Sequence, residues 1–455
     1  MNTDTTIAAI STPTGEGGIG VVRISGSNAA DIADSIFTAA SGKRLKGSVG
    51  YSAHFGTLHD KSGDTIDQCI ALVFKAPKSY TGEDIVELSV HGGDYVVRAA
   101  LRAAIDAGAV PAERGEFTKR AFLNGKLDLS EAEAVMDIIS ASDRQALSAG
   151  LAALGGAVSE KCGRIRDELK FAAATVAAFS DFPDEEPEFS GIDKLGELLE
   201  NAACRLGTFI SDYDTGRMIK NGINTVIIGP PNAGKSTLMN RLTGYDRSIV
   251  TPVAGTTRDT VEETVSFGGV TLRLCDTAGL HDTADPVEKI GVERTKERIA
   301  SADLVIVLLD GSDASYDSSE IMRLVCGKPT VVVYNKSDIA AYEPEGIKDE
   351  RQFTVSVSAK TGDGIKRLAD AIKEVTAAEH IDGSSAVYLN ERQRDCAVRA
   401  ERSVKEALSA LESGITVDAV GVLIDEALSA LYELTGERVT VEVTNEVFSK
   451  FCVGK

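Results

Sequence analysis

The chain has 455 residues and a formal net charge of −21 at pH 7. This length predicts two to four domains, each able to bury its own core, and the negative charge argues against DNA as a partner and confines any RNA contact to a local surface. The seven cysteines include no C-x-x-C pair and no apolar run reaches the length of a membrane span, so we expect a cytoplasmic protein without a disulfide framework, zinc site or membrane contact.

Residues 1–125 are predicted to form a small α+β domain. Strand-like runs alternate with stretches of helical apolar spacing. We expect strands over 6–10, 19–24, 68–74 and 85–90, and helices over 28–40 and 94–107. The glycine-rich stretch 14–20 lacks the strand-then-helix setting of a dinucleotide-binding loop, so we interpret it as a hairpin connection. The residues alone assign this domain no ligand.

Two separate stretches, 126–217 and 380–455, are predicted to be helical, because apolar residues recur in them at helical spacing. The second stretch is too short to bury a core alone. We therefore expect it to pack on the first. The helical domain is then discontinuous, and residues 218–379 form an insertion within it.

The inserted segment 218–379 is predicted to be an α/β domain with a phosphate-binding loop. The spacing G-x-x-x-x-G-K-S from Gly229 to Ser236 follows an apolar run and precedes a helical stretch. Backbone N–H groups of such a loop surround phosphates at the positive end of the next helix. Lys235 would reach the outer phosphates, and the Ser236 hydroxyl would bind Mg²⁺.

Three further motifs identify the nucleotide as GTP. One strand ends at Asp276, which would hold Mg²⁺ through water, and Gly279 would face the γ-phosphate. After another strand, the Asp338 carboxylate can accept both N–H donors on the guanine edge, a pair that adenine lacks. A loop at 358–360 would face guanine O6. The residues that these motifs predict to bind GTP are Ala233, Gly234, Lys235, Ser236, Thr237, Asp276, Thr277, Ala278, Gly279, Asn335, Lys336, Asp338, Ser358 and Ala359.

The motifs leave open which group orients the attacking water. Many small GTPases place a glutamine directly after D-x-x-G for this purpose, but this chain has Leu280 there. An apolar side chain cannot orient water, so another group must do so. The candidates nearby in sequence are the stretch 249–259 and Glu288.

Asn232 in the phosphate-binding loop, together with G-T-T-R-D at 255–259, resembles the potassium-activated branch of the translation-factor-like GTPases. The resemblance implies a K⁺ ion where other GTPases use an arginine finger. The implied K⁺ ligands are Asn232, Thr251, Val253 and Thr256, and the implied Mg²⁺ ligands are Ser236 and Thr257. The implied additional contacts to GTP are Asn232, Thr251, Thr256 and Thr257. For Asn232 the alternative is a turn-capping role.

The whole chain resembles the MnmE (TrmE) family of tRNA modification GTPases. Beyond the GTPase motifs, the resemblance rests on Gly15–Gly20, Arg23, Thr81–Asp84, Gly115–Phe117, Arg120–Asn124, Lys126–Leu129, Asp181–Glu186 and C-x-G-K at Cys452–Lys455. It implies an N-terminal domain that resembles tetrahydrofolate-binding folds and joins two copies into a homodimer. It also implies a heterotetramer or larger complex with the FAD-dependent flavoprotein MnmG. That complex would add a carboxymethylaminomethyl or aminomethyl group to carbon 5 of the wobble uridine in certain tRNAs.

The same resemblance implies roles for individual residues. Folate, as 5,10-methylene-tetrahydrofolate or the bound analogue 5-formyl-tetrahydrofolate, would contact Arg23, Glu87, Lys126 and Lys455. The alternative for each is an ordinary surface ion pair. Glu288 would be the catalytic residue that orients water, and K⁺-dependent dimerisation of the GTPase domains would drive the cycle. Cys452 would be either a nucleophile or a small residue that lines the folate site.

Two other functions share part of this pattern. A ribosome-assembly GTPase of the Era or EngA type has the same nucleotide motifs, but we find neither a KH-like tail nor a second GTPase unit in this sequence. A folate-dependent aminomethyltransferase with a dispensable GTPase would retain tRNA modification when Lys235 is replaced by alanine.

Overall fold

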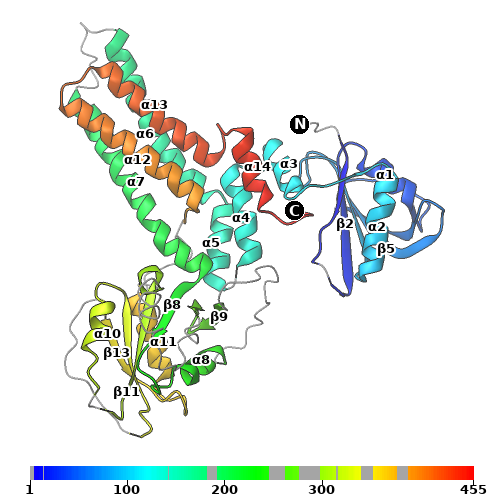
Figure 1. The fold of residues 1–455 in the computed structure, drawn as a ribbon. Coiled ribbons are helices and arrows are strands. Elements are labelled where there is room, and N and C mark those ends of the chain that lie inside the picture. Colours follow the sequence, from blue (N-terminus) through cyan, green and yellow to red (C-terminus); the bar gives the residue numbers. More distant parts are fainter. Residues whose placement is uncertain are drawn as a thin grey trace, which may run out of the picture. The chain divides into compact units, whose positions relative to one another are not determined.

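The computed structural model describes residues 5–13, 15–141, 143–181, 192–244, 262–275, 298–313, 316–339, 352–376 and 388–455. The chain divides into two compact units. The first unit comprises 1–136, 154–206 and 395–455, and the second unit comprises 137–153 and 207–394. Figure 1 labels several of their helices and strands. Within the described ranges, no helix has the length and apolarity needed to cross a membrane.

The first unit contains a seven-stranded sheet with the order β3-β4-β5-β6-β2-β1-β7. Its strands are β1 (Ile7–Ile10), β2 (Ile19–Ser25), β3 (Phe37–Ala39), β4 (Ser52–His59), β5 (Thr65–Phe74), β6 (Ile85–His91) and β7 (Val110–Pro111). Neighbouring strands are antiparallel, except for the parallel pair β1 and β7. Helices α1 (Ala29–Ile36) and α2 (Asp94–Asp106) pack their apolar side chains against one face of the sheet. This arrangement confirms the predicted α+β domain.

The four strands predicted for this domain are confirmed, but β3, β4 and β7 are missed. The helix expected over 28–40 is too long, because Phe37 adopts an extended conformation and pairs with Leu58 of β4. Only two positions of β4 are buried, so its sequence has no clear apolar alternation. Strand pairing, and not local periodicity, determines these two strands.

The glycine stretches of the N-terminal sheet lie against one another. The hairpin connection is confirmed, because β1 and β2 pair antiparallel on either side of it. Within it, the Gly17 N–H donates to the Gly92 carbonyl at 3.1 Å. A Cβ atom at Gly92 would lie only 2.5 Å from the Gly17 oxygen. The close approach of these two backbones accounts for the glycine at position 92.

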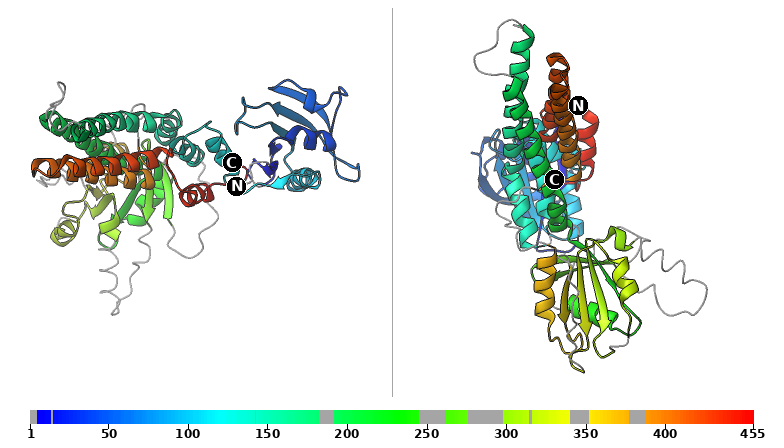
Figure 2. Two further views of the ribbon diagram at one scale, coloured as in Figure 1. Left: turned by 90° about the horizontal axis from the view of Figure 1, so that it is seen from above. Right: turned by 90° about the vertical axis from the view of Figure 1, so that its left-hand side faces the viewer.

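Long helices form the rest of the first unit, and some continue into the second. They are α3 (Glu116–Leu123), α4 (Leu129–Ser140), α6 (Ala157–Asp181), α7 (Ile192–Asn221), α12 (Glu391–Glu412), α13 (Val417–Thr435) and α14 (Val441–Ser449). A Cβ atom at Gly421 of α13 would lie 2.9 Å from Val176 of α6. The later helices therefore pack on the earlier ones, as predicted, and Figures 1 and 2 show them side by side.

The helical stretch over 130–180 is divided at two points that the apolar spacing does not reveal. Helix α5 (Arg144–Leu154) begins after Asp143, whose Oδ1 accepts the Ala146 N–H at 2.8 Å. This bond satisfies one of the free N–H groups at the helix start. Gly156, with φ of +86°, separates α5 from α6, because a left-handed residue ends a helix.

The second unit is built on a six-stranded sheet with the order β13-β12-β11-β8-β10-β9. Its strands are β8 (Ile223–Ile228), β9 (Glu262–Phe267), β10 (Val270–Cys275), β11 (Leu304–Asp310), β12 (Thr330–Asn335) and β13 (Gln352–Ser356). All pairs are parallel except β9 with β10. The central strand β11 is a continuous buried apolar run, which is typical of a parallel sheet that is covered on both faces.

Helices cover both faces of this sheet, as the right-hand view of Figure 2 shows. On one face, α8 (Lys235–Thr243) and α11 (Ile365–Val375) share an apolar cluster with the strands. On the other face lies α10 (Ser319–Leu324). The predicted α/β domain with its strand-loop-helix order is confirmed, although β9, β11 and α10 are missed.

The chain enters and leaves this α/β domain through adjacent residues. A Cβ atom at Gly216, near the end of α7, would lie 2.2 Å from the Cβ of Tyr388, where the chain returns. Tyr388 is 5% exposed and packs with Ala146 and Ala149 of α5. The Arg217 guanidinium also pairs with Asp303 at 2.5 Å. These contacts hold the points at which the chain enters and leaves the α/β domain against the domain's own sheet and against α5.

Candidate functional site

The phosphate-binding loop follows β8 and ends where α8 begins. A Cβ atom at Gly229, whose φ is +156°, would lie 2.0 Å from the Leu308 carbonyl oxygen of β11. A Cβ atom at Gly234, whose φ is +97°, would lie 2.3 Å from Nδ2 of Asn335. Both motif glycines are therefore required by close packing, and the loop backbone lies tightly against the carboxyl ends of the central strands.

The loop side chains place suitable groups around this backbone. The Lys235 ammonium donates to the carbonyls of Gly229 and Pro230, each at 2.9 Å. Asn232 is exposed in a left-handed conformation with φ of +61°, and Ser236 is exposed at the start of α8. The Asn232 amide and the Ser236 hydroxyl offer oxygen atoms, which are the ligands that Mg²⁺ and K⁺ prefer, so this donor set fits both ions.

One buried amide connects the phosphate-binding loop to the base loop, defined here as residues 358–362. Nδ2 of Asn335 donates to the Ala233 carbonyl at 2.8 Å, and its Oδ1 accepts the Ala359 N–H at 2.9 Å. Asn335 is 3% exposed. A buried amide with both ends satisfied holds its partners in one arrangement.

The other predicted base-binding residues lie beside Asn335. The buried Ser358 hydroxyl donates to Oδ1 of Asp338 at 2.7 Å. Lys336, with φ of +67°, donates to Asp310 at 2.5 Å. Burial would raise the pKa of the Asp310 carboxyl, but hydrogen bonds from Lys336 and Ser312 outweigh it and hold the pKa below its usual range.

The remaining predicted residues of the GTPase domain lie outside the described residues. They are Thr251, Val253, Thr256, Thr257, Asp276, Thr277, Ala278, Gly279 and Glu288. The structure therefore brings together the phosphate-binding loop, Asn335, Lys336, Asp338 and the base loop. Strand β10 ends at Cys275, directly before Asp276.

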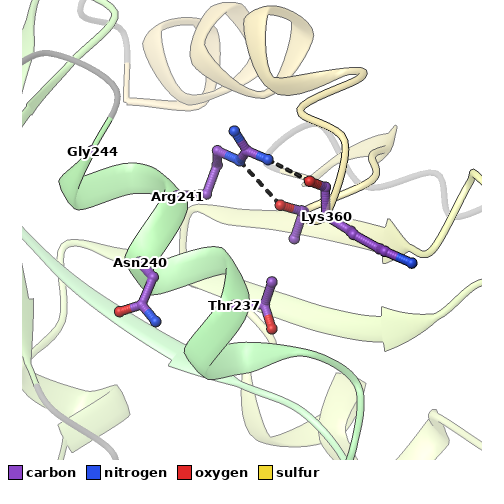
Figure 3. Close-up of a pocket in the computed structure, with 6 residues that line it drawn as sticks. Thr237, Asn240, Arg241, Gly244 and Lys360 are labelled. Carbon is purple, nitrogen blue, oxygen red and sulfur yellow. Dashed lines mark hydrogen bonds between the residues drawn. The ribbon is translucent and has the colours of Figure 1, made fainter.

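Sequence reasoning missed Arg241 of α8, which reaches the base loop. Its Nε donates to the Ala359 carbonyl at 3.1 Å and its Nη2 donates to the Lys360 carbonyl at 2.5 Å (Figure 3). Beside these bonds lies an open pocket of about 350 Å³, lined by Thr237, Asn240, Arg241, Gly244, Ala359 and Lys360. The sequence did contain an indication that Arg241 belongs to the site. It follows Thr237, a residue predicted to bind GTP, by four positions and therefore lies on the same face of the helix.

A second cluster of predicted site residues lies in the first unit. Arg23 of β2 and Glu87 of β6 are cross-strand partners, and Nε of Arg23 donates to Oε1 of Glu87 at 2.8 Å. The Arg23 guanidinium also lies over the rings of Tyr80 and Phe117, at 5.4 and 5.5 Å from their centroids. Arginine combines charge with such stacking contacts, which lysine reproduces poorly.

The C-terminal strap, residues 452–455, binds the N-terminal domain next to this cluster. The Gly115 and Phe117 N–H groups donate to the carbonyls of Cys452 and Lys455, at 3.3 and 3.2 Å. Gly454 has φ of +90°, and a Cβ atom there would lie 2.0 Å from the Ile10 oxygen. Phe117 thus contacts both Arg23 and the Lys455 backbone, while the Cys452 thiol is exposed.

Lys126, the fourth residue predicted to bind folate, makes a different contact. Its ammonium donates to the Pro77 carbonyl at 3.1 Å. The structure therefore groups Arg23, Glu87 and Lys455 around Phe117, and joins Lys126 to the turn before Tyr80.

A buried ion-pair network organises the motifs that surround this cluster. The Arg120 side chain, 4% exposed, bonds to Glu83 at 3.2 Å and to Glu116 at 2.8 Å. The Ser25 hydroxyl donates to Glu83 at 2.7 Å. These bonds give T-G-E-D at 81–84 and R-A-F-L-N at 120–124 a structural role, which the residues alone did not predict.

Comparisons with known proteins cover the chain from end to end. Residues 6–126 match the family described as the GTP-binding protein TrmE N-terminus, and residues 129–452 match the family described as the MnmE helical domain. A "tRNA modification GTPase MnmE" from Symbiobacterium thermophilum is 43% identical over 458 residues, which cover 99% of each chain. Proteins with the same description from Heliobacterium modesticaldum and Roseiflexus castenholzii are 39% and 40% identical, and the matches cover 99% and 100% of each chain.

Proposed function

This chain belongs to the MnmE family of tRNA modification GTPases, and from that premise we propose that it couples GTP hydrolysis to modification of the wobble uridine in tRNA. The chain is a P-loop GTP hydrolase that acts in tRNA modification and uses GTP with Mg²⁺. The observation that best supports nucleotide control is the Asn335 amide, which joins the phosphate-binding loop to the base loop. A nucleotide that contacts one of these two loops would therefore also affect the position of the other loop.

In the proposed GTP site, each group has a separate task. The N–H groups at the start of α8 and the Lys235 ammonium bind phosphates. Asp338, held by the Ser358 hydroxyl, accepts the two N–H donors of guanine. Mg²⁺, held by Ser236 and Thr257, would neutralise charge on the outer phosphates when bound. The K⁺ ligands in this proposal are Asn232, Thr251, Val253 and Thr256.

Hydrolysis in this proposal depends on a carboxylate and on dimerisation of the GTPase domains. Leu280 offers no polar group to orient water, so Glu288 takes that task. An ion bound beside Asn232 would supply positive charge that other GTPases obtain from an arginine finger. Two GTPase domains would associate when this ion and GTP are both bound.

The N-terminal cluster is proposed to bind 5,10-methylene-tetrahydrofolate. Arg23 and the lysines at 126 and 455 can pair with folate carboxylates, and Glu87 can accept pterin N–H groups. Together with MnmG and its FAD, the protein would add a carboxymethylaminomethyl or aminomethyl group to carbon 5 of uridine. Cys452 is the candidate thiol, since it is exposed in the C-terminal strap.

The part of the N-terminal sheet formed by β4 and β5 supports the proposed homodimer, because one of its faces is exposed. Helices α1 and α2 cover one face. On the other face, Phe55 and Ile70 are cross-strand partners and are 58% and 44% exposed. Adjacent exposed apolar side chains on a sheet face are typical of protein interfaces.

The experiment that tests the GTPase mechanism compares GTP hydrolysis in KCl and NaCl at equal ionic strength, with Asn232→Ala beside the wild type. Stimulation by K⁺ of at least about tenfold, lost in the variant, is the expected result, since an arginine finger contributes far more than this. Equal rates in the two salts would contradict the K⁺ mechanism.

A second experiment tests coupling to the tRNA reaction. Lys235→Ala should abolish GTP hydrolysis and, with it, tRNA modification reconstituted with MnmG and methylene-tetrahydrofolate. Full modification by this variant would mean that the GTPase is dispensable for the transfer.

A further inference from the structure

Among the described residues of α8, Arg241 is the charged side chain that bonds to the base loop. Its guanidinium donates to two consecutive carbonyls, of Ala359 and Lys360. Such charge-assisted bonds are stronger than neutral ones, and the planar fork of arginine suits a paired arrangement. A Cβ atom at Gly362 would lie 3.6 Å from the Arg241 guanidinium carbon, so the loop wraps closely around this group.

These two bonds determine the direction of the peptide groups in the base loop. In a trans peptide the C=O and the N–H point in opposite directions. Because the carbonyls of Ala359 and Lys360 face Arg241, the N–H groups of Lys360 and Thr361 are turned away from it. The Thr361 N–H accordingly meets the Ser358 hydroxyl at 3.1 Å.

The same short loop is connected on its other side to Asn335 and to Asp338, the residue predicted to bind the guanine edge. The Ala359 N–H donates to Asn335, and the Ser358 hydroxyl donates to Asp338. Figure 3 shows Arg241 reaching from α8 to the loop backbone. A change at Arg241 therefore acts on the loop without touching Asn335 or Asp338 directly.

We propose that Arg241 is a positioning residue for guanine recognition, which orients the base loop so that its backbone faces O6 of the base. This inference rests on the proposed GTP site. It assigns Arg241 no contact with the nucleotide. Its effect is on affinity and on discrimination at carbon 6 of the purine, and not on the hydrolysis step.

The test measures binding of GDP and of 6-thio-GDP to the full-length protein by calorimetry. In 6-thio-GDP a sulfur atom, a weaker acceptor, replaces O6, while the edge that faces Asp338 is kept. For Arg241→Ala we expect the Kd for GDP to rise about tenfold, as for the loss of one hydrogen bond to a charged group. The preference for GDP over 6-thio-GDP should fall at the same time. In hydrolysis assays the KM for GTP should rise, with kcat within about twofold of wild type.

Two further variants make the result specific. Arg241→Lys keeps the charge but not the fork, so its preference for GDP should lie between those of wild type and Arg241→Ala. If Arg241→Ala fails to fold, Arg241→Lys can be used in its place to test the proposal. Arg323→Ala removes an exposed arginine from α10, on the opposite face of the sheet, and should leave both affinities at the wild-type value.

The outcomes separate this inference from the proposed function. Equal loss of affinity for both nucleotides in Arg241→Ala would mean a general structural role and would overturn the inference, as would wild-type binding of both. A wild-type protein that fails to bind GDP would instead refute the proposed GTP site.

Discussion

Asp143, at the start of α5, accepts a hydrogen bond from the Thr271 hydroxyl of β10 at 2.5 Å. The other oxygen of the same carboxylate accepts the Ala146 N–H at 2.8 Å. One side chain thus caps α5 and binds the strand that leads to Asp276. Thr271 is 5% exposed, so the bond is shielded from water. Helix α5 is thereby tied to the sheet of the GTPase domain.

Thr271→Val should loosen α5 without removing its cap. Loss of a single shielded hydrogen bond costs about 1 kcal/mol, so amide exchange in the peptide 144–154 should accelerate about fivefold by hydrogen-exchange mass spectrometry. The bond itself is tested by a double-mutant cycle with Asp143→Ala. If Thr271→Val has the same effect in both backgrounds, the two side chains are not coupled.

Arg23→Lys should weaken folate binding even though the positive charge remains. Lysine cannot reproduce the guanidinium contacts with Glu87, Tyr80 and Phe117 together. We expect a loss of about tenfold in affinity for 5-formyl-tetrahydrofolate by calorimetry, equivalent to one charge-assisted contact. The control is Arg98→Lys, whose side chain is 71% exposed on α2. Equal affinities of Arg23→Lys and wild type would exclude a specific role for the guanidinium.

Gly454→Ala should release the C-terminal strap. The added Cβ would lie 2.0 Å from the Ile10 oxygen, and φ of +90° adds backbone strain of about 1–2 kcal/mol. Limited trypsin digestion should therefore cut after Lys450 faster than in wild type. Gly414→Ala is a matched control, because φ there is +69° but no atom lies within 4 Å of the new Cβ. Equal acceleration in both variants would attribute the effect to strain and not to lost contact with Ile10.

Stability of the first unit should fall at alkaline pH because of buried thiols. Burial raises the pKa of Cys162 to about 12, whereas an unfolded thiol titrates near 8.5. Above pH ~8.5 the unfolded chain loses a proton that the native chain keeps, so unfolding becomes more favourable by about 1.4 kcal/mol per pH unit per thiol. This loss of stability continues as the pH rises towards the pKa of the native Cys162 thiol.

The measurement is the free energy of unfolding in urea between pH 7.5 and 10. Cys162→Ala should reduce the slope against pH, and Cys204→Ala, at an exposed position, should leave it unchanged. If the free energy of unfolding has the same slope against pH in Cys162→Ala as in wild type, then groups other than Cys162 determine the pH dependence of stability.

The sequence predicted those parts of the fold that are determined by residues adjacent in the chain. The apolar run of β8 and the glycine spacing after it placed the phosphate-binding loop, because parallel central strands are apolar throughout. The motifs around Asn335 and Ser358 placed the base loop in the same way. Strands β3 and β4 were missed since their pairing partner, and not their own periodicity, determines them.

The contacts of Arg241 and Arg120 show why the rest of the site could not be predicted. Arg241 bonds to residues 118 and 119 positions away, and Arg120 bonds to Glu83, 37 positions away. Composition and spacing describe neighbours along the chain, whereas these partners meet only after folding. The position of Arg241 in the sequence indicated the face of α8 on which it lies, but it did not indicate that the base loop would be its binding partner.

The C-terminal strap also imposes an order on synthesis. The Ser11 hydroxyl bonds to the carbonyl of Gly454, 443 positions later. At about 5–20 residues per second, a ribosome needs roughly 20–90 s to make the second partner after the first. Throughout that interval the nascent N-terminal domain has the end of β1 and the start of α3 uncovered. A chain released before residues 452–455 are made would therefore keep its GTPase motifs but lack a completed Arg23 cluster, so these four residues must be synthesised before both sites exist in one molecule.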